Sequence, residues 1–156
     1  MSIYIFALLI GVVAGLRAMT APAAVSWAAY LGWLPLSGTW ATFLSYWLTP
    51  YIFTALALVE FVTDQLPSTP SRKVPPQFAA RIVSGAFCGA AIGTAGGSTL
   101  LGGLIAGALG AVLGTLGGYE ARKRLVAAIG GNDLPIALLE DLVAILLAVW
   151  VVSAVL

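Results

Sequence analysis

The sequence has no histidine and only one cysteine, Cys88. One cysteine excludes a disulfide within the chain, and we expect Cys88 to be a small buried residue. Without histidine the chain lacks a usual zinc ligand and the usual base that activates a serine or cysteine nucleophile. Any metal site would have to use oxygen ligands. We therefore expect no enzymatic activity and no cofactor.

Charged residues are also scarce. They make up 8% of the 156 residues, whereas 61% are hydrophobic. An ordinary soluble domain has about 25% charged residues, so this composition indicates an integral membrane protein. The net charge of +1 argues against nucleic acid as a partner. The N-terminal apolar run has no basic residue before it, so we interpret it as mature structure and not as a signal peptide.

The apolar segments predict an all-α integral membrane protein with about five spans and a broken first segment. Ile3 to Leu34 would form a helix of about 48 Å, which exceeds the hydrocarbon thickness of about 30 Å. Thr20 and Pro22 are predicted to break it into the half-helices Ile3 to Ala18 and Pro22 to Leu34. The other predicted spans are residues 51–66, 77–95, 100–119 and 135–156. An aromatic segment at 40–51 is predicted to lie along the membrane surface.

Basic residues predict the orientation of these spans. They form two groups: Arg72, Lys73 and Arg81, then Arg122, Lys123 and Arg124. Two predicted spans separate the groups, so both can face the cytoplasm, and the C-terminus then faces outward. The N-terminus faces inward if the first segment crosses once, which we favour, and outward if its two halves form a re-entrant hairpin.

Two pairs of segments show weak internal similarity. "GVVAGLRA" (residues 11–18) aligns with "GTLGGYEA" (114–121), and "ALALVEFVTD" (55–64) aligns with "PIALLEDLVA" (135–144). In the favoured topology these pairs predict inverted two-helix repeats around a central helix at 77–95. The repeats would divide a single transmembrane domain, residues 1–156, into halves at 1–66 and 100–156. Chance explains the identities about as well, because glycine and alanine are abundant.

Glycines recur at intervals of four residues, as in Gly85, Gly89 and Gly93, or Gly103 and Gly107. Small residues at this spacing let helix backbones approach closely in lipid. The pattern has two interpretations, packing within one chain and the seam of a homodimer. We expect membrane lipids and a second copy of the chain as partners.

Acidic residues inside apolar segments are the main candidates for function. A charged side chain at the bilayer centre costs roughly 2.5 to 3.5 kcal/mol, so it needs a partner, a water-filled cavity or a functional role. Glu60 and Asp64 are one helical turn apart, and Glu140 and Asp141 lie in the last span. Arg17 is the only basic residue predicted to lie deep enough to pair with them. Either Arg17 pairs with Glu60 or Glu140 and fixes the packing, or the acids line a site for a proton, a cation or a cationic substrate.

The loop "QLPSTPSRKVPP" also has two interpretations. Its prolines predict a stiff connector. Its hydroxyl and basic residues could instead bind a lipid phosphate; they are Ser68, Thr69, Ser71, Arg72 and Lys73.

Four segments together resemble a family of bacterial membrane proteins called domain of unknown function 4126. They are "GLRAMTAPAAVSWAA", "LVEFVTDQLPSTPSR", "GALGAVLGTLGGYEARKRL" and "ALLEDLVAI". The resemblance covers nearly the whole chain and implies a small multi-span protein of the bacterial inner membrane. It implies a Gly-Leu-Arg motif, a Glu-x-x-x-Asp motif before proline and a terminal Glu-Asp pair. It implies no activity.

These observations predict a small inner-membrane transporter or channel for an ion or small solute. Its site would lie where the broken segment meets the second and last spans, and would comprise Arg17, Thr20, Glu60, Asp64, Glu140 and Asp141. In this hypothesis Arg17 orients the substrate or gates the site. Thr20 and carbonyls near Pro22 are ligands, and the acids supply negative charge. The alternative is a lipid-binding or membrane-assembly protein without transport activity.

Overall fold

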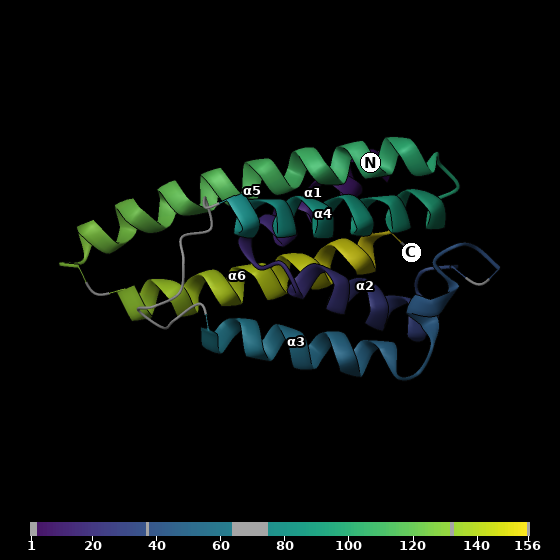
Figure 1. Ribbon diagram of the computed structural model, residues 1–156, viewed down its shortest axis with the longest axis horizontal. Coiled ribbons are helices and arrows are strands. Elements are labelled where there is room, and N and C mark those ends of the chain that lie inside the picture. The colour runs from purple at the N-terminus through teal and green to yellow at the C-terminus, as the bar shows by residue number, and fades with distance from the viewer. Residues whose placement is uncertain (1–2, 37, 64–74, 132, 156) are drawn as a thin grey trace.

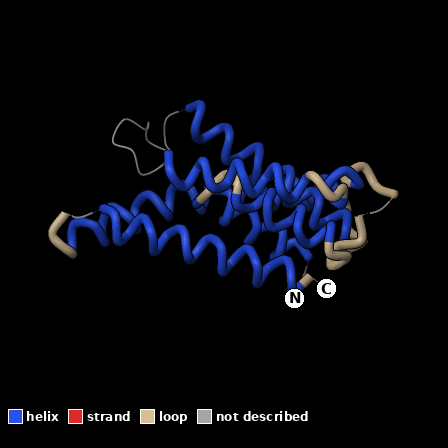
Figure 2. Tube along the Cα trace, turned by 90° about the horizontal axis from the view of Figure 1, so that it is seen from below, coloured by secondary structure: helices blue, strands red, loops and turns tan. Residues whose placement is uncertain are grey.

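The fold is entirely helical in the residues that the computed structural model describes, which are 3–36, 38–63, 75–131 and 133–155 (Figures 1 and 2). The helices are α1 (Ile3–Leu16), α2 (Thr20–Tyr30), the short 3-10 helix η1 (Thr42–Ser45), α3 (Thr49–Thr63), α4 (Pro75–Ala95), α5 (Leu100–Ala128) and α6 (Asp133–Ala154). Three of them, α4, α5 and α6, are long and apolar enough to cross a membrane. The described residues therefore form an all-α fold with three helices suited to span a membrane, as the composition predicts.

The first segment is broken at residues 17–19, slightly before the predicted position. Pro22 lies in the first turn of α2. A proline is tolerated there because the first N–H groups of a helix have no intrahelical acceptor. Pro22 is thus accommodated in the first turn of the second half-helix, and the chain turns at Arg17, Ala18 and Met19.

The two half-helices double back on each other. Tyr4, in the first turn of α1, has its hydroxyl oxygen 3.1 Å from Thr99 Oγ1, just before α5. In the segment that follows α2, the Trp40 indole N–H donates to Thr94 Oγ1 near the end of α4, at 3.0 Å. Since α4 and α5 join at this end, the outer ends of α1 and α2 point to the same end of the bundle (Figure 1). α1 and α2 thus form a hairpin, as in the re-entrant alternative, and not the single straight passage that we favoured.

Both termini consequently lie near the same end of the bundle (Figure 2). The ring of Phe6 on α1 lies 6.2 Å from the ring of Trp150 on α6. The opposite end carries the end of α5 and the starts of α4 and α6 (Figure 1).

Glycines bring α1, α4 and α5 into backbone contact within one chain. A Cβ atom added to Gly11 would overlap the Gly107 carbonyl group, and one added to Gly89 would overlap the Gly103 carbonyl oxygen. Such close approach maximises van der Waals contact between helices in lipid. The described contacts therefore account for the glycine faces by packing within the chain.

The packing of α1 against α5 does not support the inverted repeat. Gly11 of α1 faces Gly107 of α5, and Gly15 faces Thr115 further along. The two helices therefore run in the same direction, whereas an inverted repeat of these segments requires opposite directions.

Two other predicted boundaries need correction. Helix α5 extends beyond the predicted span 100–119 as far as Ala128, because "EARKRLVAA", which was predicted as a cationic helix end, consists mainly of strong helix formers. Arg124 and Glu120, one turn apart on this extension, form an exposed ion pair of 3.1 Å. The aromatic segment at 40–51 contains only the single 3-10 turn η1 before α3 begins at Thr49.

Candidate functional site

Arg17 lies at the break between α1 and α2 and reaches α6. Its side chain has no exposed surface, and its Nε donates to Asp141 Oδ1 at 2.6 Å. Its Nη1 donates to Glu140 Oε1 at 2.9 Å and to the Leu16 carbonyl at 3.0 Å. The planar guanidinium presents several donors at fixed angles, so one arginine can bind two adjacent carboxylates. These bonds connect the break to α6.

Glu60 connects α3 to the same break through the backbone. Its Oε2 accepts the Ala18 N–H, and its Oε1 accepts the Met19 N–H, both at 2.9 Å. These N–H groups immediately precede α2, where the helix dipole is positive. The carboxylate of Glu60 therefore caps the second half-helix, a role that the sequence analysis did not predict.

Arg81, on α4, stabilises the other side of the break. Its guanidinium is buried, and Nη1 donates to the carbonyls of Gly15 and Leu16 at 2.8 and 2.9 Å. These carbonyls end α1, where the dipole is negative. On the same helix, the Ser84 hydroxyl donates to the Ala18 carbonyl.

Arg81 was grouped with the basic residues around a cytoplasmic loop, near the start of the predicted span 77–95, and its role at the break was not predicted. A signal was available, because Arg81 precedes Ser84 by three residues and Gly85 by four. All three residues thus share one face of a helix that is otherwise largely apolar. The assumption that Arg17 is the only deep basic residue is wrong.

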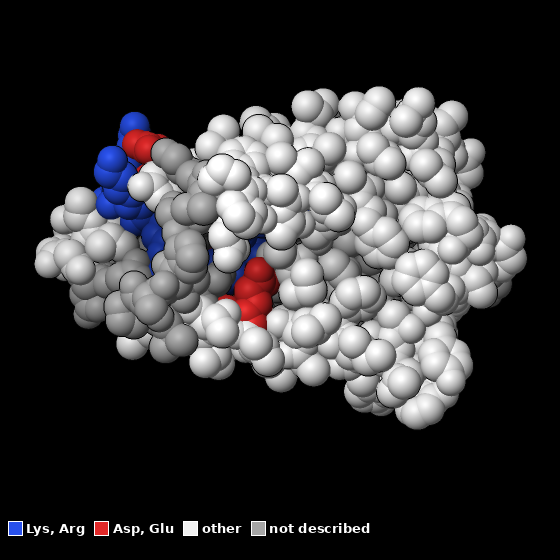
Figure 3. Space-filling model, in the orientation of Figure 1, with Lys and Arg blue, Asp and Glu red and all other residues white. Residues whose placement is uncertain are grey.

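Five ionisable side chains from separate parts of the chain converge at the break, and we call them the break cluster: Arg17, Glu60, Arg81, Glu140 and Asp141. The break cluster contains three acids and two bases. Figure 3 shows acidic and basic atoms recessed near the middle of one face, whereas the part of this face towards the termini shows no charge. On this face the charges are thus concentrated at the break and at the end of the bundle away from the termini.

A cavity of about 160 Å³ lies beside the break cluster, between α5 and α6. Leu16, Glu140 and Arg122 are among the residues that line it. Glu140 therefore contacts both the buried Arg17 and a space that extends to the basic part of α5.

The other predicted site residues have different outcomes. Thr20 is buried, but its hydroxyl has no hydrogen-bond partner among the described residues. It lines a second, apolar cavity between α2, α3 and α6. Asp64 lies outside the described residues, as does the predicted lipid-phosphate site: Ser68, Thr69, Ser71, Arg72 and Lys73. Those predictions stay untested.

Comparisons with protein-family models, with curated proteins and with solved structures find no match to this chain. The family resemblance stated from the sequence stays a prediction. Among the described residues, no group of three or more acidic, histidine or cysteine side chains could hold a metal ion.

Proposed function

We propose that this protein is a small membrane transporter or channel for protons or a small cation, and that the break cluster is its binding site. The observation that carries the proposal is the meeting of two half-helices at a group of three acids and two bases, of which Arg17, Arg81 and Asp141 are buried and the two glutamates partly buried. Ionisable side chains are rare inside membranes and mark ion or proton pathways when they occur. Broken helices similarly mark the binding sites of many secondary transporters.

The acidic side chains favour a cationic substrate. The break cluster brings three carboxylates together, and the buried Arg17 binds two of them, Glu140 and Asp141. Glu140 is the entry point in this proposal, because it contacts the cavity beside Arg122 as well as Arg17. A proton or cation entering from that cavity would compete with Arg17 for the carboxylate.

The proposed topology combines the hairpin with four crossings by α3, α4, α5 and α6. Helix α3 has 15 residues, a length of about 22 Å, which is short for the hydrocarbon core. Arg122, Lys123 and Arg124 at the end of α5 then face the cytoplasm, and both termini face outward. A location in the bacterial inner membrane fits this arrangement.

Cysteine accessibility tests the topology. We expect Ser98→Cys and Ser153→Cys, in a Cys88→Ala background, to react with an impermeant thiol reagent added to intact cells. Ala128→Cys, at the opposite end of the bundle, should react only after permeabilisation. Reaction at Ala128→Cys in intact cells, or protection of the other two, would contradict the proposed orientation.

Flux into vesicles tests the transport proposal. We expect wild-type protein to move protons or a monovalent cation into proteoliposomes, and Glu60→Gln to reduce the flux to that of empty vesicles. The amide can still accept a hydrogen bond but carries no charge. The measurement is a pH-sensitive dye for protons and isotope uptake for cations, with the folded fraction determined on the same samples.

Glu120→Gln is the matched control, since it removes an exposed carboxylate from the end of α5. It should transport at the wild-type rate. Absence of flux in wild-type vesicles, or equal flux in Glu60→Gln, would reject the transporter. The alternative of a lipid-binding or membrane-assembly protein would then stand.

A further inference from the structure

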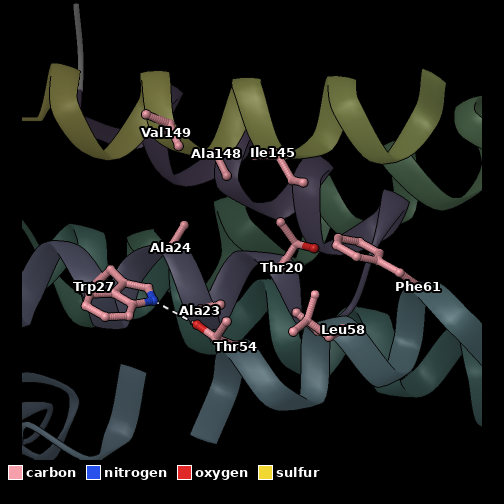
Figure 4. A pocket seen from close by; sticks show the side chains of 11 residues that line it. Thr20, Ala23, Ala24, Trp27, Thr54, Leu58, Phe61, Ile145, Ala148 and Val149 are labelled. Carbon is pink, nitrogen blue, oxygen red and sulfur yellow. Dashed lines mark hydrogen bonds between the residues drawn. The ribbon is translucent and has the colours of Figure 1, made fainter. Parts of the chain in front are cut away.

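The second cavity has an apolar wall and a volume of about 250 Å³ (Figure 4). It lies between α2, α3 and α6, and alanine, leucine, isoleucine, valine and aromatic side chains form most of its surface. An engineered apolar cavity of about 150 Å³ is large enough to bind benzene, so this cavity can hold a larger apolar group.

One polar atom in this cavity is unsatisfied. The Thr20 side chain belongs to a residue that is 6% exposed, and its Oγ1 has no hydrogen-bond partner among the described residues. Its hydroxyl points into the space between Ile145 and Phe61 (Figure 4). The second hydroxyl of the wall, on Thr54, already accepts the Trp27 indole N–H at 2.7 Å. Burying a hydroxyl without a hydrogen-bond partner is unfavourable, so a ligand atom that bonds to the Thr20 hydroxyl would lower the free energy.

Water fits this requirement poorly. A buried water molecule usually makes about three hydrogen bonds, and the cavity wall offers Thr20 and the already bonded Thr54. A molecule with one oxygen atom and an apolar chain would satisfy Thr20 and fill the rest of the space.

We propose that this cavity binds the alkyl chain of a fatty alcohol-like amphiphile from the bilayer, with the ligand oxygen hydrogen-bonded to Thr20. Entry from the lipid side is consistent with the position of α3 at the edge of the bundle, where Leu56, Val59 and Val62 are exposed (Figure 1). The site differs in chemistry from the break cluster and does not depend on transport.

Tryptophan fluorescence tests the proposal, because Trp27 lines the cavity. We expect a medium-chain alcohol brominated on its chain to quench wild-type fluorescence in nanodiscs with a saturable dependence on concentration. Trp27→Phe should remove the saturable part, and the other four tryptophans report simple partitioning into lipid. Ala24→Phe should also remove it, by filling the cavity while leaving Trp27 in place.

The role of Thr20 is tested with a near-isosteric change. Thr20→Val should weaken binding of the bromo-alcohol about three- to tenfold, the value of one buried neutral hydrogen bond. The corresponding bromoalkane, which has no oxygen, should bind wild type and Thr20→Val equally. Quenching that does not saturate, or that is unchanged in Ala24→Phe, would overturn the site. Equal affinity of the alcohol for wild type and Thr20→Val would overturn the assignment of the ligand oxygen.

Discussion

Gly107→Ala is expected to destabilise the protein severely, and Gly107→Leu to prevent folding. A Cβ atom added to Gly107 would overlap the Gly85 carbonyl oxygen and would lie 2.9 Å from Gly89 Cα. Both neighbours are backbone atoms, so no flexible side chain can move aside. Extra methylenes in a packed core typically reduce stability by about 1 to 3 kcal/mol. The loss should exceed that range here, because the helices cannot separate locally. Thermal unfolding in detergent and the folded fraction by gel filtration would measure the effect.

Gly117→Ala is the matched control on the same helix. A Cβ atom added there meets no atom within 4 Å. Alanine has a higher helix propensity than glycine by about 1 kcal/mol, so the variant should be as stable as wild type or slightly more stable. Similar melting temperatures for Gly107→Leu and Gly117→Leu would show that the contact of α5 with α4 and α1 does not support the fold.

Arg17→Met is expected to cost about 3 to 5 kcal/mol of stability, because it leaves buried acids without their cation. The carboxylates of Glu140 and Asp141 are only 9% and 11% exposed, so water cannot solvate them fully. The triple change Arg17→Met, Glu140→Gln and Asp141→Asn removes the charges together and should recover most of the loss. Equilibrium unfolding in detergent or lipid would measure these differences.

Arg124→Met provides the comparison for a surface pair. Arg124 and Glu120 are 78% and 50% exposed, and an exposed pair contributes about 0 to 1 kcal/mol. If Arg17→Met costs no more than Arg124→Met, the buried bonds do not stabilise the break. If the triple variant stays as unstable as the single variant, the loss arises from packing of the arginine side chain and not from unpaired charge.

Several features of the candidate site could be predicted from the sequence. A charged residue in an apolar segment needs a partner wherever the segment packs, so Arg17, Glu60, Glu140 and Asp141 were all candidates before the fold was known. The pair of Arg17 with Glu140 was one of the two predicted pairs and is present, but the bond from Arg17 to Asp141 was not predicted. Arg17 and Asp141 are separated by 124 positions, and no local pattern indicates that they meet. Arg81 was missed because a basic residue close to a loop is usually interpreted as an orientation signal.

The sequence by itself determined the membrane environment, the helical class and the close packing of glycine faces. These properties follow from composition and from spacing along one helix, which are local quantities. Only the tertiary structure decided that α1 and α2 double back, that α1 and α5 run in the same direction and that Glu60 and Arg81 cap the two half-helices. These features depend on which apolar faces meet. In lipid, many pairings of apolar faces are nearly equal in energy until backbone contact and buried hydrogen bonds select one of them.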